Sequence, residues 1–169
     1  KNNVLEKEEK EAVTEFKEMI DKNILLKSYK GMGYTNTILP YPLKNYILKN
    51  PKWYTSYTPY QPEISQGRLE SQYNYQIVIK DLTKMDISNA SLLDEGSSAS
   101  EALDLAYNYN KKKKNTFYCS SNLHPQVLEV VKTKAKINNN NLILFNNENE
   151  IDLNEDTFGI LFQYPDTYG

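Results

Sequence analysis

Apolar residues recur at helical spacing near the start of the chain. Within residues 8–22 they fall three or four positions apart among Glu and Lys, at Val13, Phe16, Met19 and Ile20. This spacing places them on one side of a helix. We therefore predict an amphipathic helix over this segment.

Glycines and prolines punctuate the next part of the chain. Gly31 and Gly33 interrupt the pattern, and the run "PYPLKNYILKN" after them predicts a short helix opened by proline. The stretch "YTPYQPEISQGRLE" at residues 57–70 is too rigid and too aromatic for a simple surface connector. Apolar residues share one side again over residues 65–84, which predicts the longest helix.

The second half alternates between short apolar runs and a helical pattern. The runs "TFYC", "NLILF" and "FGILFQY" predict strands, and residues 125–135 predict a helix between the first two. This alternation indicates a mainly parallel α/β sheet with flanking helices and right-handed crossovers. Because a parallel sheet is normally larger and covered on both faces, we expect an incomplete part of a larger fold. We expect residues 1–64 to form a helical and loop arm and residues 65–169 the first part of the sheet domain.

Composition excludes several classes of protein. The chain has 169 residues and a formal net charge of −2, so bulk charge gives no reason to expect nucleic acid or an anionic membrane as partner. One Cys and one His cannot form an intrachain disulfide or a conventional zinc site, and no run approaches the ~20 apolar residues of a membrane helix. The chain begins with Lys1 and shows no signal peptide, so we expect a processed, truncated or fragmentary protein.

The segment "LLDEGSSASEA" predicts the start of a second helix near Ser98. In one interpretation Ser98 caps the helix, Glu101 completes a capping box and Gly96 makes the turn. In the other, the backbone N–H groups of Gly96, Ser97 and Ser98 hold a phosphate at the positive end of the helix dipole. The two acidic residues just before the turn would repel such an anion.

The single histidine, His124, follows the predicted strand "TFYC". Ligands of open α/β sheets bind at the carboxyl ends of the strands, where an imidazole could stack on a ring or shuttle protons. Alternatively, His124 caps the next helix or bonds a carbonyl group. Cys119 lies five residues earlier, and a thiol–imidazole pair would require the two side chains to be adjacent in space.

Five segments together resemble one known family. Their order and spacing are those of the N-terminal half of the glycine decarboxylases, the P-proteins of the glycine cleavage system, from about residue 29 to residue 169. The segments are "YKGMGYTNTILP", "NPKWYTSYTPYQPEISQGRLE", "DLTKMDISNASLLDEGSSASEALDLA", "HPQVLEVVKTKAKI" and "FGILFQYPDTYG".

The resemblance implies a fold and an activity for the whole protein. The fold is the large domain of the pyridoxal-phosphate-dependent transferases, fold type I, the aspartate-aminotransferase type. The family are oxidoreductases of glycine catabolism that use pyridoxal phosphate to decarboxylate glycine and pass the aminomethyl group to the lipoylated H-protein. In this family the Schiff-base lysine lies in the C-terminal half or in a second subunit, so we expect no catalytic residue here and a homodimer or heterotetramer.

The resemblance also implies roles for single residues. Gly96, Ser97 and Ser98 match the phosphate-holding position of the fold and His124 the ring-stacking position, although this half of the family resembles a copy that could have lost the cofactor. The family usually has a threonine followed by alanines where this chain has "GSSASEA", and a serine keeps the hydroxyl group.

The aromatic stretch has two possible roles in this family. Either its residues shape the glycine pocket across a subunit interface, or its rings simply pack the two halves together. The residues concerned are Tyr57, Tyr60, Glu63 and Ser65. The chain as a whole could also be a noncatalytic scaffold or separate subunit that supports a catalytic half. The resemblance places the protein in the mitochondrial matrix of a eukaryote or in the cytoplasm of a bacterium.

Overall fold

The structure is a computed structural model that describes residues 8–54 and 58–169. The chain divides into two compact units, with the boundary between Gly31 and Met32. The boundary predicted between residues 64 and 65 stays a prediction, and it falls within helix α3.

Helix α1, Glu9–Ile20, confirms the first predicted helix. Glu9 and Glu11 lie in its first turn and Lys17 in its last, which complements the helix dipole. None of its residues is buried, and the ring of Phe16 is 66% exposed. The apolar side of α1 therefore has no cover from the described residues of its own unit.

A short helical segment opens the second unit. Pro40 caps helix α2, Tyr41–Leu43, and a π-helical turn, Lys44–Leu48, continues it. The predicted short helix is confirmed. Its start at proline follows from the fixed backbone torsion of that residue.

Helix α3, Pro62–Thr83, begins three residues earlier than the predicted start at Ser65. Proline favours the first turn of a helix because it lacks the N–H group that would be unpaired there. Ser65 departs from helical geometry, with φ −125° and ψ 23°, and kinks the helix. Glu63 thus belongs to the helix and not to the segment predicted before it, whereas Ser65, the predicted first residue of the helix, lies inside it.

Helix α4, Glu95–Tyr109, also begins earlier than expected. The predicted cap at Ser98 is wrong, since Asp94 is the cap and its carboxylate accepts a hydrogen bond from the Ser97 N–H group. Ser98 lies inside the helix, and Gly96 lies in its first turn instead of in a preceding turn. A carboxylate caps a helix as well as a serine hydroxyl does and also interacts favourably with the helix dipole.

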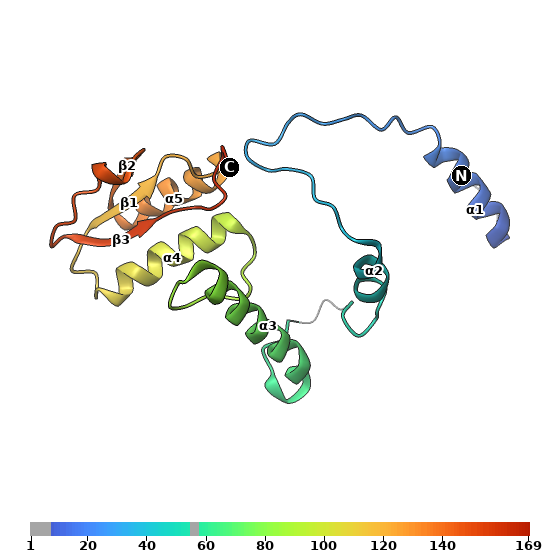
Figure 1. Ribbon diagram of the computed structural model, residues 1–169, viewed down its shortest axis with the longest axis horizontal. Coiled ribbons are helices and arrows are strands. Elements are labelled where there is room, and N and C mark those ends of the chain that lie inside the picture. Colours follow the sequence, from blue (N-terminus) through green and yellow to red (C-terminus); the bar gives the residue numbers. More distant parts are fainter. Residues whose placement is uncertain (1–7, 55–57) are drawn as a thin grey trace, which may run out of the picture. The chain divides into compact units, whose positions relative to one another are not determined.

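The predicted parallel sheet is confirmed, with strand order β2-β1-β3. Its strands are β1, Thr116–Ser120, β2, Asn141–Phe145, and β3, Thr157–Leu161. Helix α5, Pro125–Asn138, connects β1 to β2, and a 3₁₀ turn η2, Glu148–Glu150, lies between β2 and β3. β1 is the central strand (Figure 1).

The core lies between this sheet and helices α4 and α5 (Figure 1). Leu103 of α4 and Val131 of α5 are fully buried against Phe117 and Cys119 of β1. Tyr118, whose side chain points to the opposite face of the strand, is also buried. Its hydroxyl donates to the Asp152 carbonyl at 2.8 Å. Burial of four consecutive residues of β1 is typical of a central parallel strand.

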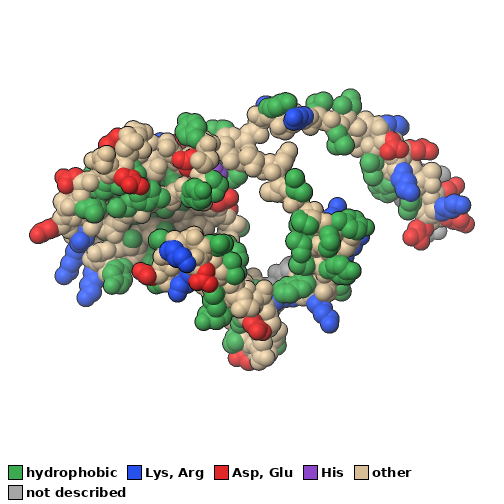
Figure 2. Space-filling view, viewed as in Figure 1, with side chains coloured by type: hydrophobic (Ala, Val, Ile, Leu, Met, Phe, Trp, Pro, Cys, Tyr) green, Lys and Arg blue, Asp and Glu red, His purple; other side chains and the backbone are tan. Residues whose placement is uncertain are grey.

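Much apolar surface remains exposed outside this core. Figure 2 shows hydrophobic side chains gathered over α2 and its neighbouring residues. Along α3, Tyr73, Val78 and Leu82 are more than half exposed. The helical patterns seen in the sequence are therefore present, but no residue of α3 belongs to the sheet core formed by the described residues.

Candidate functional site

The carboxyl ends of β1 and β3 face the first turns of α4 and α5. A cavity of about 450 Å³ lies there. Its lining is mostly apolar, with Leu123, Val127 and Phe162, and Ser98 and Gln163 add polar groups. Ligands of open parallel sheets bind at this edge, so this is the candidate site that the topology favours.

The first turn of α4 is already occupied by a carboxylate. Asp94 Oδ1 accepts from the Ser97 N–H group at 2.7 Å, and this hydrogen bond lowers the pKa of Asp94 below its ordinary value. Gly96 has a packing reason of its own, since a Cβ atom there would lie 3.2 Å from Val130 Cγ2. Gly96 therefore permits the close approach of α4 and α5.

These residues do not fit the phosphate of pyridoxal phosphate. The N–H group of Ser97 is paired within the chain, and Asp94 and Glu95 place two acidic side chains at the same helix end. A phosphate would have to displace one carboxylate and lie beside another. Ser98 remains the one hydroxyl of the predicted set that lines the cavity.

His124 is buried beneath a segment distant in the sequence. Its backbone N–H group donates to Gln163 Oε1 at 2.8 Å, and its side chain makes no capping hydrogen bond. Its ring centroid lies 4.5 Å from that of Tyr34 at an interplanar angle of 60°. Both ring nitrogens are buried, and neither has a hydrogen-bond partner within the described part of the chain.

Gly33 makes this burial possible. A Cβ atom at Gly33 would lie 2.6 Å from Cδ2 and 2.8 Å from Nε2 of His124, and its φ of +100° is one that other residues rarely adopt. Burial, followed by the charges of Glu95 and Asp94, raises the pKa of the Tyr34 hydroxyl. The imidazole is thus covered by Gly33 and Tyr34, which does not fit a role in stacking on a cofactor ring.

Sequence reasoning did not assign Gly33, Tyr34 or Gln163 to this site. The tight glycine spacing of "GMGY" was the available signal, because a glycine with positive φ often marks a close approach. The target of that approach, 91 positions further along the chain, could not be found from spacing.

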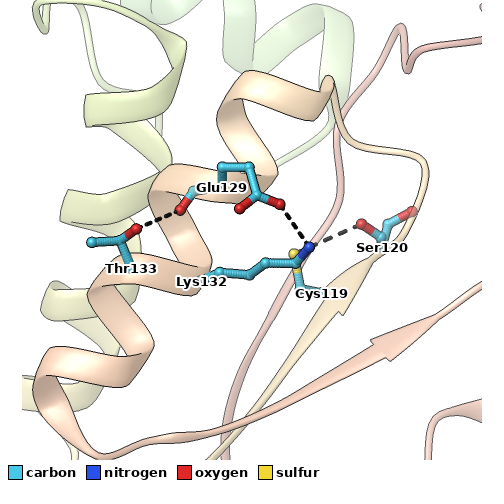
Figure 3. Close-up of polar contacts among 5 residues, drawn as sticks. All are labelled: Cys119, Ser120, Glu129, Lys132 and Thr133. Carbon is cyan, nitrogen blue, oxygen red and sulfur yellow. Dashed lines mark hydrogen bonds and ion pairs between the residues drawn. The ribbon is translucent and has the colours of Figure 1, made fainter.

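Cys119 is a core residue and not a partner of His124. It is fully buried, and its thiol donates to the Ser120 carbonyl at an Sγ···O distance of 3.7 Å (Figure 3). Burial raises the pKa of the thiol to about 12, against a smaller opposing effect of Lys132. Lys132 itself pairs with Glu129 at 2.7 Å (Figure 3). The thiol is therefore protonated near neutral pH and is a poor nucleophile.

The residues predicted for the substrate pocket lie elsewhere, just before α3 and in its first turns. Tyr57 lies outside the described residues, and the side chain of Tyr60 is 70% exposed. Glu63 is exposed in the first turn of α3, while Ser65 is only 4% exposed. Ser65 lines a cavity of about 490 Å³, so of this set it is the residue that the structure places at a cavity.

The described residues offer neither a metal-binding cluster nor a membrane-spanning helix. Residues 8–54 and 58–169 contain no group of three or more His, Cys, Asp or Glu side chains placed to hold a metal ion. None of the helices in the same residues has both the length and the hydropathy needed to cross a membrane.

Comparison with known proteins identifies the family. The model of the "Glycine cleavage system P-protein" family matches residues 2–169. Glycine dehydrogenase (decarboxylating) of Photobacterium profundum is 49% identical over 161 residues, which are 95% of this chain and 17% of that protein. The protein of the same name from Synechocystis sp. is 46% identical over 158 residues, which are 94% of this chain and 16% of that protein.

A solved structure shares the fold. It is the crystal structure of glycine decarboxylase (P-protein) of the glycine cleavage system in inhibitor-bound form, which is 23% identical with a TM-score of 0.72. It covers 99% of this chain, and the chain covers 39% of it. The predicted fold, part of a large domain of the pyridoxal-phosphate-dependent transferases, is confirmed.

The chain spans about one sixth of the length of the curated relatives that it matches. The family model spans nearly all of this chain, from residue 2 to residue 169. The chain belongs to the family of glycine cleavage system P-proteins.

Proposed function

We propose that this chain is part of an oxidoreductase that decarboxylates glycine and transfers the aminomethyl group to the lipoyl arm of the H-protein. The observation that carries the proposal is 49% identity to a glycine dehydrogenase (decarboxylating) over 95% of the chain. Glycine and the lipoylated H-protein are the partners that this activity requires.

The role of this portion in the enzyme is a supporting one. The helix end at Asp94 is capped by a carboxylate, and His124 is covered by Gly33 and Tyr34. Pyridoxal phosphate, which the family implies for the whole enzyme, would then be held by residues of the C-terminal half or of a second subunit. These observations favour a scaffold role for residues 95–124, while the arm before them contributes to the glycine pocket.

The end of the arm and the adjoining residue Ser65 have the side chains for such a pocket. Tyr60 presents an exposed aromatic ring, Glu63 an exposed carboxylate and Ser65 a buried hydroxyl group. An aromatic ring with a polar tip can exclude water from a neighbouring site and still donate a hydrogen bond. We include Tyr57 in this pocket because it belongs to the same sequence motif.

A homodimer or heterotetramer is the assembly that we propose for the enzyme. In either assembly, the arm of one subunit would reach the active site of another subunit. By the same family resemblance, the enzyme would work in the mitochondrial matrix of a eukaryote or the cytoplasm of a bacterium.

The test is glycine–bicarbonate exchange by the full-length protein with pyridoxal phosphate and lipoylated H-protein. We expect exchange, and we expect the double variant Tyr57→Phe, Tyr60→Phe to lose it by at least about tenfold, because two hydroxyl groups that order the pocket are removed. Size-exclusion chromatography should show an unchanged assembly state.

Two other outcomes would contradict parts of this proposal. Retained exchange with loss of assembly would show that the tyrosines pack the halves together. Absence of exchange by the unsubstituted full-length protein would favour the noncatalytic scaffold, which is the second candidate function.

A further inference from the structure

Residues 32–34 cover the imidazole of His124, which is 6% exposed. The Tyr34 ring contacts the imidazole, and Gly33 approaches the edge formed by its Cδ2 and Nε2 atoms. A Cβ atom at Gly33 would also lie 3.1 Å from the Cα atom of Thr167. We call residues 32–34 the strap. All of these contacts lie within the second compact unit, which begins at Met32.

The strap makes no hydrogen bond with any other described residue. Met32 has a φ of 52°, a left-handed conformation that is unfavourable for a residue with a side chain. The closed strap therefore depends on ring contact and close packing, and the backbone conformation of Met32 opposes closure.

The buried imidazole also favours opening of the strap. Neither Nδ1 nor Nε2 of His124 has a hydrogen-bond partner among the described residues. A buried polar group without a partner costs free energy, which is recovered when water reaches the group. Segments with few hydrogen bonds and few buried contacts open locally while the rest of the fold persists. The strap has the features of such a segment.

The cavity at the carboxyl ends of β1 and β3 adjoins this histidine. Leu123, the residue before His124, lines the cavity, and so does Gln163, whose Oε1 atom accepts from the His124 backbone N–H group. Ser98 and Glu95 add a hydroxyl group and a carboxylate to the lining. An imidazole exposed at this edge would add a nitrogen base to these polar groups.

We propose that the strap opens and closes over His124, and that its opening exposes the imidazole at the edge of this cavity. The structure shows the closed state. The proposal does not depend on glycine decarboxylation, because it concerns a local movement that is measured without glycine or cofactor.

Carbethoxylation by diethyl pyrocarbonate measures this movement, because the reagent modifies an imidazole nitrogen that it can reach. His124 is the only histidine of this chain. Peptide mapping by mass spectrometry distinguishes it from the other histidines of the full-length protein. The rate at His124 is compared with the rate for N-acetylhistidine at the same neutral pH.

We expect His124 to react at least about tenfold more slowly than N-acetylhistidine and still to react completely, because modification requires the strap to open. Gly33→Ala should raise the rate at least about fivefold, since the added Cβ atom does not fit against the imidazole. Gly67→Ala is the matched control. A Cβ atom at Gly67 meets no atom within 4 Å, so the rate should change by less than about twofold.

Two variants of Tyr34 separate the contribution of the ring from that of the hydroxyl group. Tyr34→Ala should raise the rate at His124 about fivefold, because the ring contact is lost. Tyr34→Phe keeps the ring and should leave the rate within about twofold of the unsubstituted protein. Far-ultraviolet circular dichroism of each variant confirms that the fold is retained.

Three results would overturn the proposal. Complete protection of His124 in the folded protein would show that the cover is fixed. A rate equal to that of N-acetylhistidine would show that the strap does not close. An unchanged rate in Gly33→Ala or in Tyr34→Ala would show that the reagent reaches the imidazole by another route.

Discussion

Asp94 determines where helix α4 begins. Its carboxylate accepts from the Ser97 N–H group, and its backbone carbonyl accepts from the Ser98 N–H group at 2.9 Å. The carboxylate thereby satisfies one N–H group of the first turn, which has no partner within the helix, and the carbonyl accepts the first intrahelical hydrogen bond. The same carboxylate makes this helix end unsuitable for an external anion.

Replacing this cap should loosen the first turn. We expect Asp94→Ala to speed amide hydrogen exchange over residues 95–99 about fivefold, because the capping hydrogen bond is lost. Ser98→Ala is the matched control and should leave exchange nearly unchanged, since Ser98 is not the cap. A larger effect of Ser98→Ala than of Asp94→Ala would contradict the assignment.

The contribution of this cap should depend on pH in a defined direction. The pKa of Asp94 in the folded chain is lowered from the ordinary value of 3.8, chiefly by its hydrogen bonds with Ser97. Its stabilising effect is therefore present above that value and is lost as the pH falls through the lowered pKa. The protection of the amides of residues 95–99, measured as their exchange rate relative to that of an unstructured peptide at the same pH, should fall in that acidic range, and Asp94→Asn should remove this dependence.

At the scale of elements, α5 has one buried and one exposed side. Val131 is fully buried in the core, whereas the adjacent Val130 is 40% exposed. Lys134 on the same helix forms an ion pair with Asp104 of α4. Since both side chains of that pair are partly exposed, apolar burial contributes more to the packing of α4 on α5 than the ion pair does.

Alanine substitutions at these two valines should distinguish the buried side of α5 from its exposed side. We expect Val131→Ala to lower the free energy of unfolding by about 2–3 kcal/mol, because two methyl groups are lost and a cavity remains. Val130→Ala should lower it by less than about 1 kcal/mol. Urea denaturation followed by circular dichroism measures both. Equal effects would show that the helix is packed differently.

At the scale of the whole molecule, the described chain has a small core and extensive exposed apolar surface. β2 and β3 are the outer strands of the three-stranded sheet. Open strand edges and exposed apolar side chains favour association with other polypeptides. We therefore expect this chain to associate when it is made alone.

The isolated chain should also fail to bind pyridoxal phosphate at one defined lysine. The helix end at Asp94 does not fit a phosphate, and no lysine lines the cavity beside it in the described structure. Borohydride reduction of the mixture, followed by peptide mapping, should find at most scattered labelling of exposed residues such as Lys111–Lys114. A single stoichiometric adduct together with glycine–bicarbonate exchange would overturn this expectation.

The sequence by itself determined the elements and their order. Helical spacing in α1 and α3 and the short apolar runs of β1, β2 and β3 reflect backbone periodicity, which is a local property. The parallel arrangement followed from the alternation of strand and helix. The family followed from five segments in register, a signal that depends on ancestry and not on local physics.

Only the tertiary structure decided what the candidate residues do. The sequence predicted Ser98 as the cap of α4, whereas in the structure Asp94 is the cap. His124 acquired its environment from Gly33 and Tyr34, which are about ninety positions away. Contacts between distant segments depend on how elements pack in three dimensions, and local periodicity contains no information about that packing.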